Sequence, residues 1–507
     1  MGKEKMSNNE TICALATAIG GALGIIRVSG PDAISVVRSV CRPVKATTPA
    51  NTVHYTHIVN AEGETLDECL ISIFKAPHSY TGEDSVEISC HGSRYILNKV
   101  LELLVQNGCR MANPGEFTQR AYLNGKMDLS QAEAVADLIA STNKATHHIA
   151  MSQLRGGIST ELSVLRDKLL KLTSLLELEL DFSDHEDLEF ADRTELLELT
   201  ESIDRHILRL AKSFEAGQAI KQGIPVAIIG APNVGKSTLL NSLLGEERAI
   251  VSDIQGTTRD AIEDTIDLQG ITFRFIDTAG IRHTSDTIEQ LGIERSVAAA
   301  QRARVIIMMT EPGKPYPEIE AREDQTVIRI ENKTKTFQAK YGIGVDELKE
   351  RLVAAVPTFS ENDTIITNAR HYDALMRAHD SILNVLAGMG AGIGTNMGTC
   401  IGAGIGTGIG TGIGADMGAD MGTGMGSGMG ANMGTGIGAD MGTVMGTGKG
   451  TVMGAGNTTN QLIPSLPSDL LAEDLRHTLD ILSEITGGQI TPQETLNNIF
   501  AHFCVGK

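Results

Sequence analysis

The amino-acid sequence predicts a multidomain protein with α/β and all-α parts, in which an α/β domain is inserted into a discontinuous helical domain. Residues 1–124 mix short β-rich runs with a helical run, which is typical of an α+β domain. Residues 125–220 and 358–507 have the apolar spacing of helices. Residues 221–357 alternate strand-like and helical runs, which indicates a parallel sheet.

Within the first segment we expect strands at 24–28, 69–74 and 85–89 and a helix at 95–106. In the second segment, leucines recur at spacings of three and four and build one apolar face on a long helix. They are Leu162, Leu165, Leu169, Leu172 and Leu176. A second long helix is expected at 193–217.

The third and fourth segments complete the order of elements. The expected strands of the third segment are 226–229, 272–276, 305–309 and 327–330. The expected helices of the fourth are 368–386, 468–485 and 492–503. Because helices flank the α/β segment on both sides, we expect the two helical segments to form one domain.

Composition restricts the class of function. The 507 residues include 43 Lys and Arg against 63 Asp and Glu, a formal charge of −20, which disfavours a general nucleic-acid coat protein because an acidic surface repels phosphate. The seven cysteines contain no Cys-x-x-Cys pair, so neither a disulfide framework nor a zinc site is indicated. With no signal peptide and no long apolar run, we expect a cytoplasmic protein without membrane contact.

Residues 389–456 form a tandem repeat of four residues, [Met/Ile/Lys]-Gly-[Ala/Thr/Ser]-x, and the 68 residues divided by four give seventeen units. Glycine in every unit disfavours a helix, and a period of four drifts around a helix of 3.6 residues per turn. We expect a flexible surface insertion. The alternative is a segment that self-associates through its Met and Ile positions.

Residues 230–237, Gly-Ala-Pro-Asn-Val-Gly-Lys-Ser, match the phosphate-loop pattern G-x-x-x-x-G-K-[ST] between an expected strand and a helix. In this pattern backbone N–H groups surround the phosphates, Lys236 reaches the β and γ phosphates, and the Ser237 hydroxyl binds Mg²⁺. The nucleotide-binding stretch also includes Asn233, Val234, Gly235 and Thr238.

Two further segments follow in the order expected of a GTPase. Residues 257–260, Thr-Thr-Arg-Asp, supply hydroxyls for the metal and the γ-phosphate, and we assign Thr258 to Mg²⁺. The second segment is Asp277, Thr278, Ala279 and Gly280, directly after an expected strand. By itself it could be an ordinary strand-to-turn junction, but its place after the other two segments indicates a switch that contacts Mg²⁺ and the γ-phosphate.

The element that reads the base departs from the GTPase pattern. Asn332 and Lys333 follow an expected strand as in Asn-Lys-x-Asp, but position 335 is Lys. The Asp of that motif accepts two hydrogen bonds from guanine, which an ammonium group cannot do. Residues 338–340, Gln-Ala-Lys, take the place of Ser-Ala-Lys only a few residues later. We therefore expect a trimmed domain with weakened guanine selectivity.

The order of these motifs resembles the bacterial tRNA-modification GTPases of the MnmE (TrmE) family over nearly the whole chain apart from the repeat. The likeness extends to Gly-Ile-Ile-Arg-Val-Ser-Gly at 24–30, Thr-Gly-Glu-Asp at 81–84 with His91 and Gly92, Pro-Gly-Glu-Phe at 114–117, Asn-Gly-Lys-Met-Asp-Leu at 124–129 and Phe-Cys-Val-Gly-Lys at 503–507. The resemblance implies an N-terminal formyl-tetrahydrofolate-binding and dimerisation domain, a discontinuous helical domain and an inserted Ras-like P-loop GTPase domain.

The resemblance also implies a homodimer that works with a flavoprotein partner. Together they add a carboxymethylaminomethyl group to C5 of the wobble uridine of certain tRNAs, using 5-formyl-tetrahydrofolate or a related one-carbon folate. Arg27, Glu87 and Lys126 are implied folate contacts, and Lys507 reaches the same site; without the resemblance each would be assigned to a surface ion pair. Cys504 is implied to lie near the modification chemistry, and its alternative is a helix-end thiol.

The resemblance further assigns a K⁺ site to Asn233, Ser252, Ile254 and Thr257, with Asp253, Gln255 and Gly256 in the same nucleotide-binding stretch. A K⁺ between the phosphates neutralises developing charge where other GTPases use an arginine finger. Glu289, twelve residues after Asp277, is implied to position the attacking water. Residues 286–289 also fit a helix capping pattern, so that alternative stays open.

Two other functions fit the sequence. One is a regulatory GTPase of ribosome assembly without folate chemistry, which would not bind 5-formyl-tetrahydrofolate. The other is a folate-binding scaffold whose trimmed GTPase domain no longer turns over, which would release no phosphate from GTP.

Overall fold

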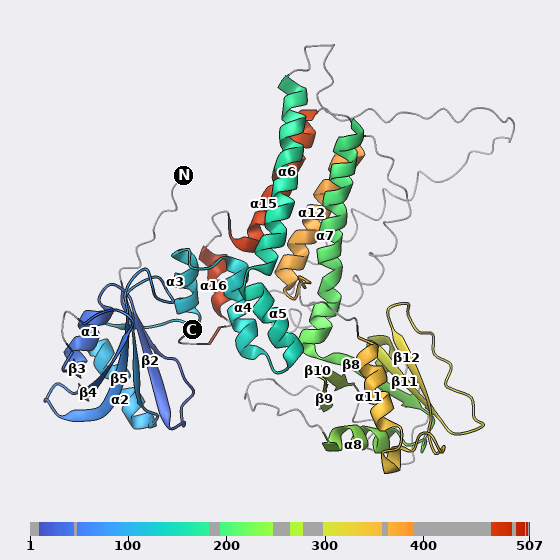
Figure 1. Cartoon of the computed structure of the whole chain (residues 1–507), viewed down its shortest axis with the longest axis horizontal. Coiled ribbons are helices and arrows are strands. Elements are labelled where there is room, and N and C mark those ends of the chain that lie inside the picture. Colours follow the sequence, from blue (N-terminus) through green and yellow to red (C-terminus); the bar gives the residue numbers. More distant parts are fainter. Residues whose placement is uncertain are drawn as a thin grey trace, which may run out of the picture.

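The computed structural model describes residues 10–44, 48–181, 193–246, 264–276, 298–356, 363–389, 468–488, 493–501, 503, 504 and 506. Figure 1 shows an N-terminal sheet unit, a tall helical bundle, and a second sheet unit at the base of the bundle. This arrangement confirms the predicted combination of α/β and all-α parts.

The N-terminal unit is a seven-stranded mixed sheet in the order β3-β4-β5-β6-β2-β1-β7. Its strands are β1 (Ile12–Leu15), β2 (Leu23–Ser29), β3 (Cys41–Arg42), β4 (Thr52–Val59), β5 (Thr65–Phe74), β6 (Ser85–His91) and β7 (Arg110–Met111). Helices α1 (Ala33–Val40) and α2 (Arg94–Gln106) bury their apolar residues with those of the sheet in one core. The strands expected at 24–28, 69–74 and 85–89 and the helix expected at 95–106 are confirmed, whereas β1, β3, β4, β7 and α1 were not anticipated.

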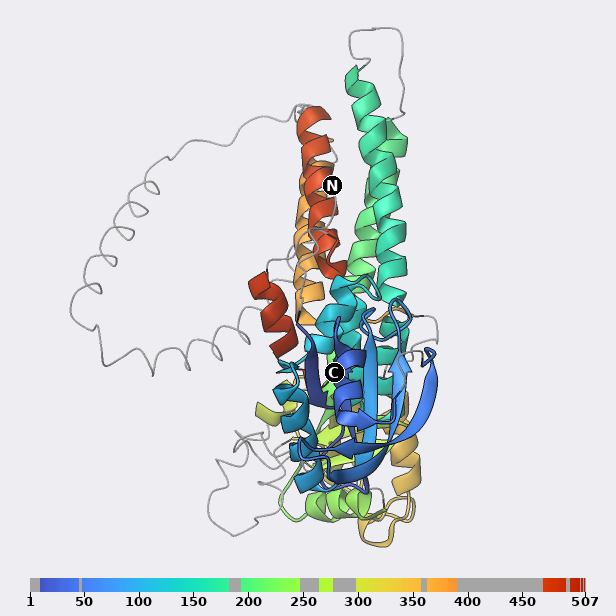
Figure 2. The ribbon, with the colours of Figure 1, turned by 90° about the vertical axis from the view of Figure 1, so that its left-hand side faces the viewer.

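Three shorter helices, α3 (Glu116–Leu123), α4 (Leu129–Ala140) and α5 (Lys144–Leu154), lead into the bundle. The bundle consists of α6 (Gly157–Asp181), α7 (Arg193–Gln222), α12 (Ala369–Gly388) and α15 (Ser468–Thr486), and α16 (Gln493–Ala501) follows at its side. The expected leucine face of α6 is buried, and it shares one core with α7, α12 and α15. Figures 1 and 2 show these helices side by side, so segments from both sides of the second sheet unit form one body.

Met389 belongs to this body although it is the first residue of the four-residue repeat. It follows the last residue of α12 and is 4% exposed. The Thr200 hydroxyl donates a hydrogen bond to its sulfur at 3.8 Å. The expectation that the insertion begins at 389 is therefore wrong by one residue, because this methionine fills the bundle core. Residues 390–456 lie beyond the described part of the chain.

The second sheet has the order β12-β11-β8-β10-β9 and is parallel except for β9. Its strands are β8 (Ile224–Gly230), β9 (Asp264–Leu268), β10 (Ile271–Phe275), β11 (Val305–Thr310) and β12 (Thr326–Glu331). Helices α8 (Lys236–Glu246) and α11 (Val345–Ala354) pack in its larger core. The four expected strands are confirmed, whereas β9, which pairs antiparallel with β10, was not anticipated.

Two connections of this sheet are unusually simple. Parallel strands are ordinarily joined through a helix, but residues 311–325 between β11 and β12 contain none. Between β12 and α11 the chain forms only a single 3₁₀ turn, η1 (Ala339–Tyr341). That this α/β unit is trimmed after Asn332 stays a prediction.

Candidate functional site

The phosphate loop joins the central strand of the second sheet to a helix N-terminus. Strand β8 ends at Gly230, and α8 begins at Lys236. The Lys236 ammonium reaches back across the loop, where Nζ donates to the carbonyl oxygens of Gly230 at 2.6 Å and Ala231 at 3.1 Å. Burial lowers the pKa of Lys236. The ammonium and the helix N-terminus together favour an anion at this place.

Close packing determines the shape of this loop. A Cβ on Gly230 would lie 2.6 Å from the carbonyl oxygen of Met309, and a Cβ on Gly235, whose φ is +104°, would collide with the amide of Asn332. Asn233 also has a left-handed backbone, with a φ of +60°. Elements next to the loop therefore fix its conformation as much as the loop's own residues do.

Asn332 connects the phosphate loop to the segment on the base side. It directly follows β12 and is 4% exposed. Its Nδ2 donates to the Val234 carbonyl oxygen at 2.7 Å, and its Oδ1 accepts from the Ala339 backbone N–H at 3.1 Å. One buried amide thus ties the phosphate loop to the segment that follows β12.

Lys333 lies beside the same loop and is paired with an acid. Its Nζ donates to the Asn233 carbonyl oxygen at 3.4 Å and forms an ion pair with Glu311. Hydrogen bonds from Lys314 and Lys333 hold the pKa of Glu311 down at about 2. Glu311 is therefore ionised at neutral pH and keeps the ammonium of Lys333 at the mouth of the loop.

Lys335 occupies the position where a base-reading Asp is expected, and it is exposed. The link that carries it is closed by short-range bonds: Thr334 N–H donates to the Phe337 carbonyl oxygen at 3.1 Å, and Phe337 N–H donates to Thr334 Oγ1 at 3.0 Å. No Asp or Glu occurs from 332 to 345. The base side therefore has its amide anchor but lacks a carboxylate on this link.

Ser237 and Thr238 lie in the first turn of α8, next to Lys236. The remaining expected ligands fall outside the described residues; they are Ser252, Asp253, Ile254, Gln255, Gly256, Thr257, Thr258, Asp277, Thr278, Ala279, Gly280 and Glu289. Strand β10 pairs in parallel with β8, the strand that leads into the phosphate loop. Position 277 follows two residues after the end of β10.

A second site lies on the N-terminal sheet, where Arg27 of β2 and Glu87 of β6 are paired across the strands. Arg27 Nε and Nη2 both donate to Oε1 of Glu87, at 2.9 and 2.7 Å, and the two side chains are 20% and 28% exposed. Among the described residues no hydrogen bond reaches the other carboxylate oxygen. The rings of Tyr80 and Phe117 lie 5.5 and 5.7 Å from the guanidinium carbon. The pair thus offers a carboxylate acceptor on Glu87 beside a guanidinium that lies near two aromatic rings, and such a set of groups suits a flat polar heterocycle.

The chain's own C-terminal tail reaches this second site. Arg27 Nη1 donates to the carbonyl oxygen of Gly506 at 3.2 Å, and Lys507, the next residue, is not among the described ones. Cys504 is exposed close by. Lys126 Nζ donates to the Pro77 carbonyl oxygen at 2.9 Å, in the loop that carries Tyr80. The implied folate residues that are described therefore lie on neighbouring elements.

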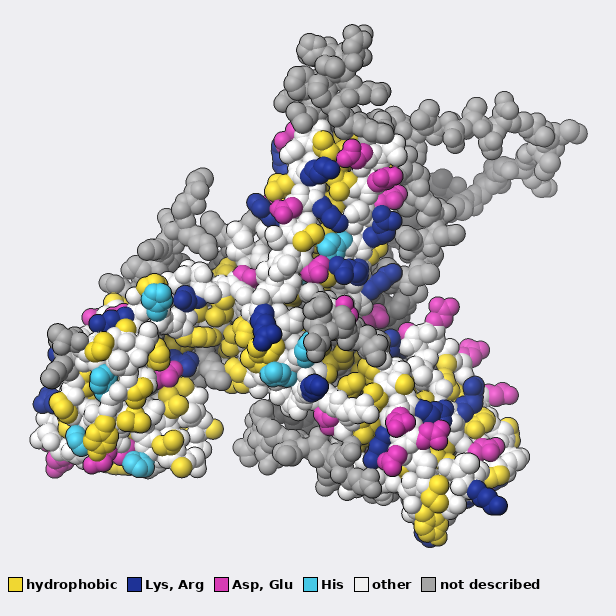
Figure 3. Space-filling model, in the orientation of Figure 1, with side chains coloured by type: hydrophobic (Ala, Val, Ile, Leu, Met, Phe, Trp, Pro, Cys, Tyr) yellow, Lys and Arg dark blue, Asp and Glu magenta, His cyan; other side chains and the backbone are white. Residues whose placement is uncertain are grey.

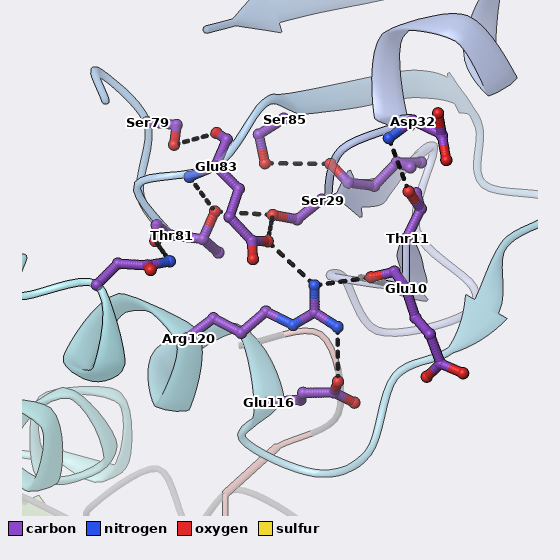
Figure 4. A network of polar contacts seen from close by, with 12 residues as sticks. Glu10, Thr11, Ser29, Asp32, Ser79, Thr81, Glu83, Ser85, Glu116 and Arg120 are labelled. Atoms are coloured by element: carbon purple, nitrogen blue, oxygen red, sulfur yellow. Dashed lines mark hydrogen bonds and ion pairs between the residues drawn. The ribbon is translucent and has the colours of Figure 1, made fainter. Parts of the chain in front are cut away.

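A buried charge network supports the loop beside Arg27, and the sequence did not single it out (Figure 4). Arg120 of α3 is 2% exposed and donates to Glu83 at 3.1 Å, to Glu116 at 3.0 Å and to the Glu10 carbonyl oxygen at 2.9 Å. Burial pushes the pKa of Glu116 up, but hydrogen bonds from Arg110 and its other donors outweigh it, so the pKa lies below its usual value. The two motifs at 81–84 and 114–117 each contribute one of these glutamates, which was the available signal.

Fold and site together define a multidomain P-loop nucleotide-binding protein, in which the C-terminal tail contacts Arg27 on the N-terminal sheet. Residues 11–126 match the family described as GTP-binding protein TrmE N-terminus, and residues 129–399 match the family described as MnmE helical domain. The chain belongs to the MnmE (TrmE) family.

Curated relatives match along nearly the full length. The chain is 45% identical over 540 residues to the tRNA modification GTPase MnmE of Bacteroides fragilis, with 99% of this chain and 100% of the relative covered. It is 46% identical over 572 residues to the protein of the same name from Phocaeicola vulgatus, with the same coverage. In the part of the chain that the structure describes, no helix is long and apolar enough to span a bilayer, and no cluster of three or more His, Cys, Asp or Glu is placed to hold a metal.

Proposed function

We propose that the chain is a tRNA-modification GTPase, the activity for which its curated relatives are named. One observation carries the proposal: a single chain combines a phosphate loop, anchored by Asn332, with an Arg27–Glu87 site that the chain's own C-terminal tail reaches. An ordinary regulatory GTPase has no need of the second site. The product we assign is a carboxymethylaminomethyl group on C5 of the wobble uridine of certain tRNAs.

In the GTPase half, Lys236 and the N–H groups of the loop bind the β and γ phosphates, as the lysine and the helix N-terminus favour anions there. Ser237 and Thr258 are the proposed Mg²⁺ ligands, and Asp277 supports the metal shell. When bound, Mg²⁺ neutralises phosphate charge. Asn332 orients the base side through its bonds to both walls of the pocket.

For hydrolysis we propose K⁺ beside the phosphates, held by Asn233, Ser252, Ile254 and Thr257. Asn233 is exposed in the phosphate loop, and its side-chain amide offers an oxygen acceptor of the kind that a monovalent cation requires. Glu289 is the proposed residue that orients the attacking water.

At the second site we propose a one-carbon folate, bound by Arg27, Glu87, Lys126 and Lys507. The free oxygen of Glu87 fits this group, because a carboxylate can accept hydrogen bonds from the amino and ring N–H groups of a pterin. The folate supplies one carbon to the modification. We further propose a cytoplasmic homodimer that acts with a flavoprotein partner.

The test is analysis of wobble uridine in tRNA from cells that lack the protein, with the wild-type gene and an Arg27→Ala gene restored separately. We expect the modified nucleoside to vanish, to return with the wild-type gene and to stay absent with the variant. In parallel, the purified protein should bind 5-formyl-tetrahydrofolate. Unchanged tRNA together with no folate binding would favour the ribosome-assembly alternative, and folate binding without phosphate release from GTP would favour the scaffold.

A further inference from the structure

The C-terminal tail is held on both sides of Cys504. Before the cysteine, Phe503 is 8% exposed and its ring centroid lies 5.1 Å from that of Phe500 in a buried apolar cluster. After it, Gly506 is buried and its carbonyl oxygen accepts from Arg27. Cys504 itself is exposed between these anchors. The thiol therefore occupies a defined place, unlike a tail that swings freely.

Gly115, the residue before α3, forms the seat under the first anchor. Its N–H lies 3.4 Å from the carbonyl oxygen of Cys504. Its φ is +66°, and a Cβ there would lie 2.8 Å from the Phe500 carbonyl oxygen and 2.9 Å from Phe503 Cβ. Real Cβ atoms do not approach other atoms so closely, so a side chain at 115 would displace the tail.

Gly506 makes the corresponding contact at the second anchor. Its φ is +92°, and a Cβ on it would collide with the carbonyl oxygen of Leu15 at the end of β1. Two glycines far apart in the sequence thus allow the tail and the N-terminal unit to approach each other. The helix after Gly115 also carries Phe117, whose ring lies against Arg27. The same short element aligns the tail and one wall of the Arg27 site.

We propose that Gly115 is a positioning residue that seats the C-terminal tail and so holds Cys504 and Gly506 beside the Arg27–Glu87 pair. The role of that pair in modification rests on the proposed function, whereas the seating rests on the contacts above. Displacing the seat separates the tail from Arg27 without touching the phosphate loop.

The test is Gly115→Ala in the full chain, with Gly63→Ala as the matched control. Gly63 also has a left-handed backbone, with a φ of +84°, but nothing lies within 4 Å of its Cβ. Gly115→Ala should speed hydrogen exchange of the peptide covering 493–507 by about tenfold, whereas Gly63→Ala should not. Because a misplacement of about 1 Å can cost on the order of a hundredfold in rate, wobble-uridine modification should fall by about tenfold or more. GTP hydrolysis should stay at the wild-type rate.

Gly506→Ala is an independent variant within the tail, and it should show the same two changes. It decides the question if Gly115→Ala does not fold. The proposal requires faster exchange and lost modification together, so either change alone, or neither, in a folded variant overturns it. A wild-type protein that modifies no wobble uridine would overturn the proposed function instead, and hydrogen exchange would still decide whether Gly115 seats the tail.

Discussion

Lys335 is the residue at which this chain departs most from a guanine-reading pocket. Asn332 bonds to the phosphate loop and to Ala339, so the link that begins with Asn332 is fixed at both sides. Lys335, in contrast, is exposed on a link closed by Thr334 and Phe337. An ammonium can donate to the guanine carbonyl but cannot accept from its N–H groups.

We therefore expect the protein to prefer GTP over ATP and XTP by a narrower margin than its relatives. Losing a charge-assisted hydrogen bond typically removes on the order of 1.5–3 kcal/mol, while the phosphate contacts of Lys236 are unaffected. Lys335→Asp should restore selectivity only in part, because the short link also shapes the pocket. Competition binding with the three triphosphates measures this, and a preference for GTP of about a thousandfold or more would refute the expectation.

GTP hydrolysis should be faster in K⁺ than in Na⁺ by about tenfold, which corresponds to roughly 1.4 kcal/mol in the activation free energy.

Replacing Glu289 with Ala should lower turnover by about a hundredfold with almost unchanged nucleotide affinity, because a residue that orients water acts mainly in the transition state. Phosphate release and nucleotide binding measured in both salts provide the check. Equal rates in the two salts would remove the K⁺ assignment, and an equal loss of affinity and turnover would remove that of Glu289.

Residue pairs show where prediction from the sequence stops. The phosphate loop was recognisable because its chemistry is local: eight consecutive residues carry it. Arg120 and Glu83 were not, because they are 37 positions apart and meet only when α3 packs behind the loop. Nothing in the local pattern distinguishes a buried arginine from an exposed one before the fold is known.

At the scale of helices and strands, long apolar patterns were the reliable signal. The leucine face of α6 and the buried strands β8 and β11 were expected because their hydrophobic pattern is long or continuous. The two-residue strands β3 and β7 have no pattern of their own and exist because neighbouring strands supply their hydrogen bonds. The existence of long helices and strands could therefore be predicted from their hydrophobic pattern. The order of the strands in each sheet could not, because it depends on pairing between distant segments.

The contact between α7 and α12 contains a largely buried histidine paired with a carboxylate. His379 Nδ1 lies 2.5 Å from Asp204 Oδ1, and both side chains are 12% exposed. The hydrogen bond to Asp204 raises the pKa of His379, while burial opposes the rise. A histidine whose pKa is raised on folding adds stability that is fully present below its unfolded pKa of about 6.5 and is lost as pH rises through the folded value.

We expect the free energy of unfolding of the wild type to fall as the pH rises from about 6 to about 9. In His379→Gln this fall should be smaller by on the order of 1 kcal/mol. Urea unfolding of the full chain, followed by far-ultraviolet circular dichroism at each pH, measures the difference. Asp204→Asn is the matched variant of the partner residue, and it should show the same weaker pH dependence of the unfolding free energy. Parallel pH curves for wild type and variants would contradict the role of this pair.

At the scale of the whole molecule, two features bear on function: the distribution of charge and the way the helical bundle connects the two sheet units. Figure 3 shows acidic and basic side chains interspersed over the bundle and the second sheet unit, in keeping with the formal charge of −20. A tRNA would therefore have to be bound by local groups or with a partner's help. The bundle joins both sites, because α4 follows the N-terminal unit and α7 leads directly into β8.

Removing residues 390–456 should leave GTP hydrolysis and tRNA modification intact. The connection between Met389 and α15 spans 390–467, or 78 residues, and taking out 67 leaves 11. At about 0.6 kcal/mol per halving of loop length, the deletion should stabilise the fold by about 1.7 kcal/mol. Thermal unfolding and both activities are the measurements.

A deletion that also removes Met389 is the control for this experiment. It should cost about 2–5 kcal/mol relative to the deletion that spares it, because it empties a buried position of the bundle. Loss of either activity in the deletion that keeps Met389 would show that the tetrads contribute to function.

Helix α12 ends and α15 begins at the same end of the bundle (Figures 1 and 2), so both attachment points of the segment that carries the repeat lie there. Each unit is four codons, or four times three nucleotides, so replication slippage can add or drop whole units without changing the reading frame. Because the energetic cost of a longer connection grows only logarithmically, selection on folding barely opposes such changes. The gene should therefore behave as a minisatellite, and sequencing it from closely related isolates should reveal alleles that differ by multiples of this unit.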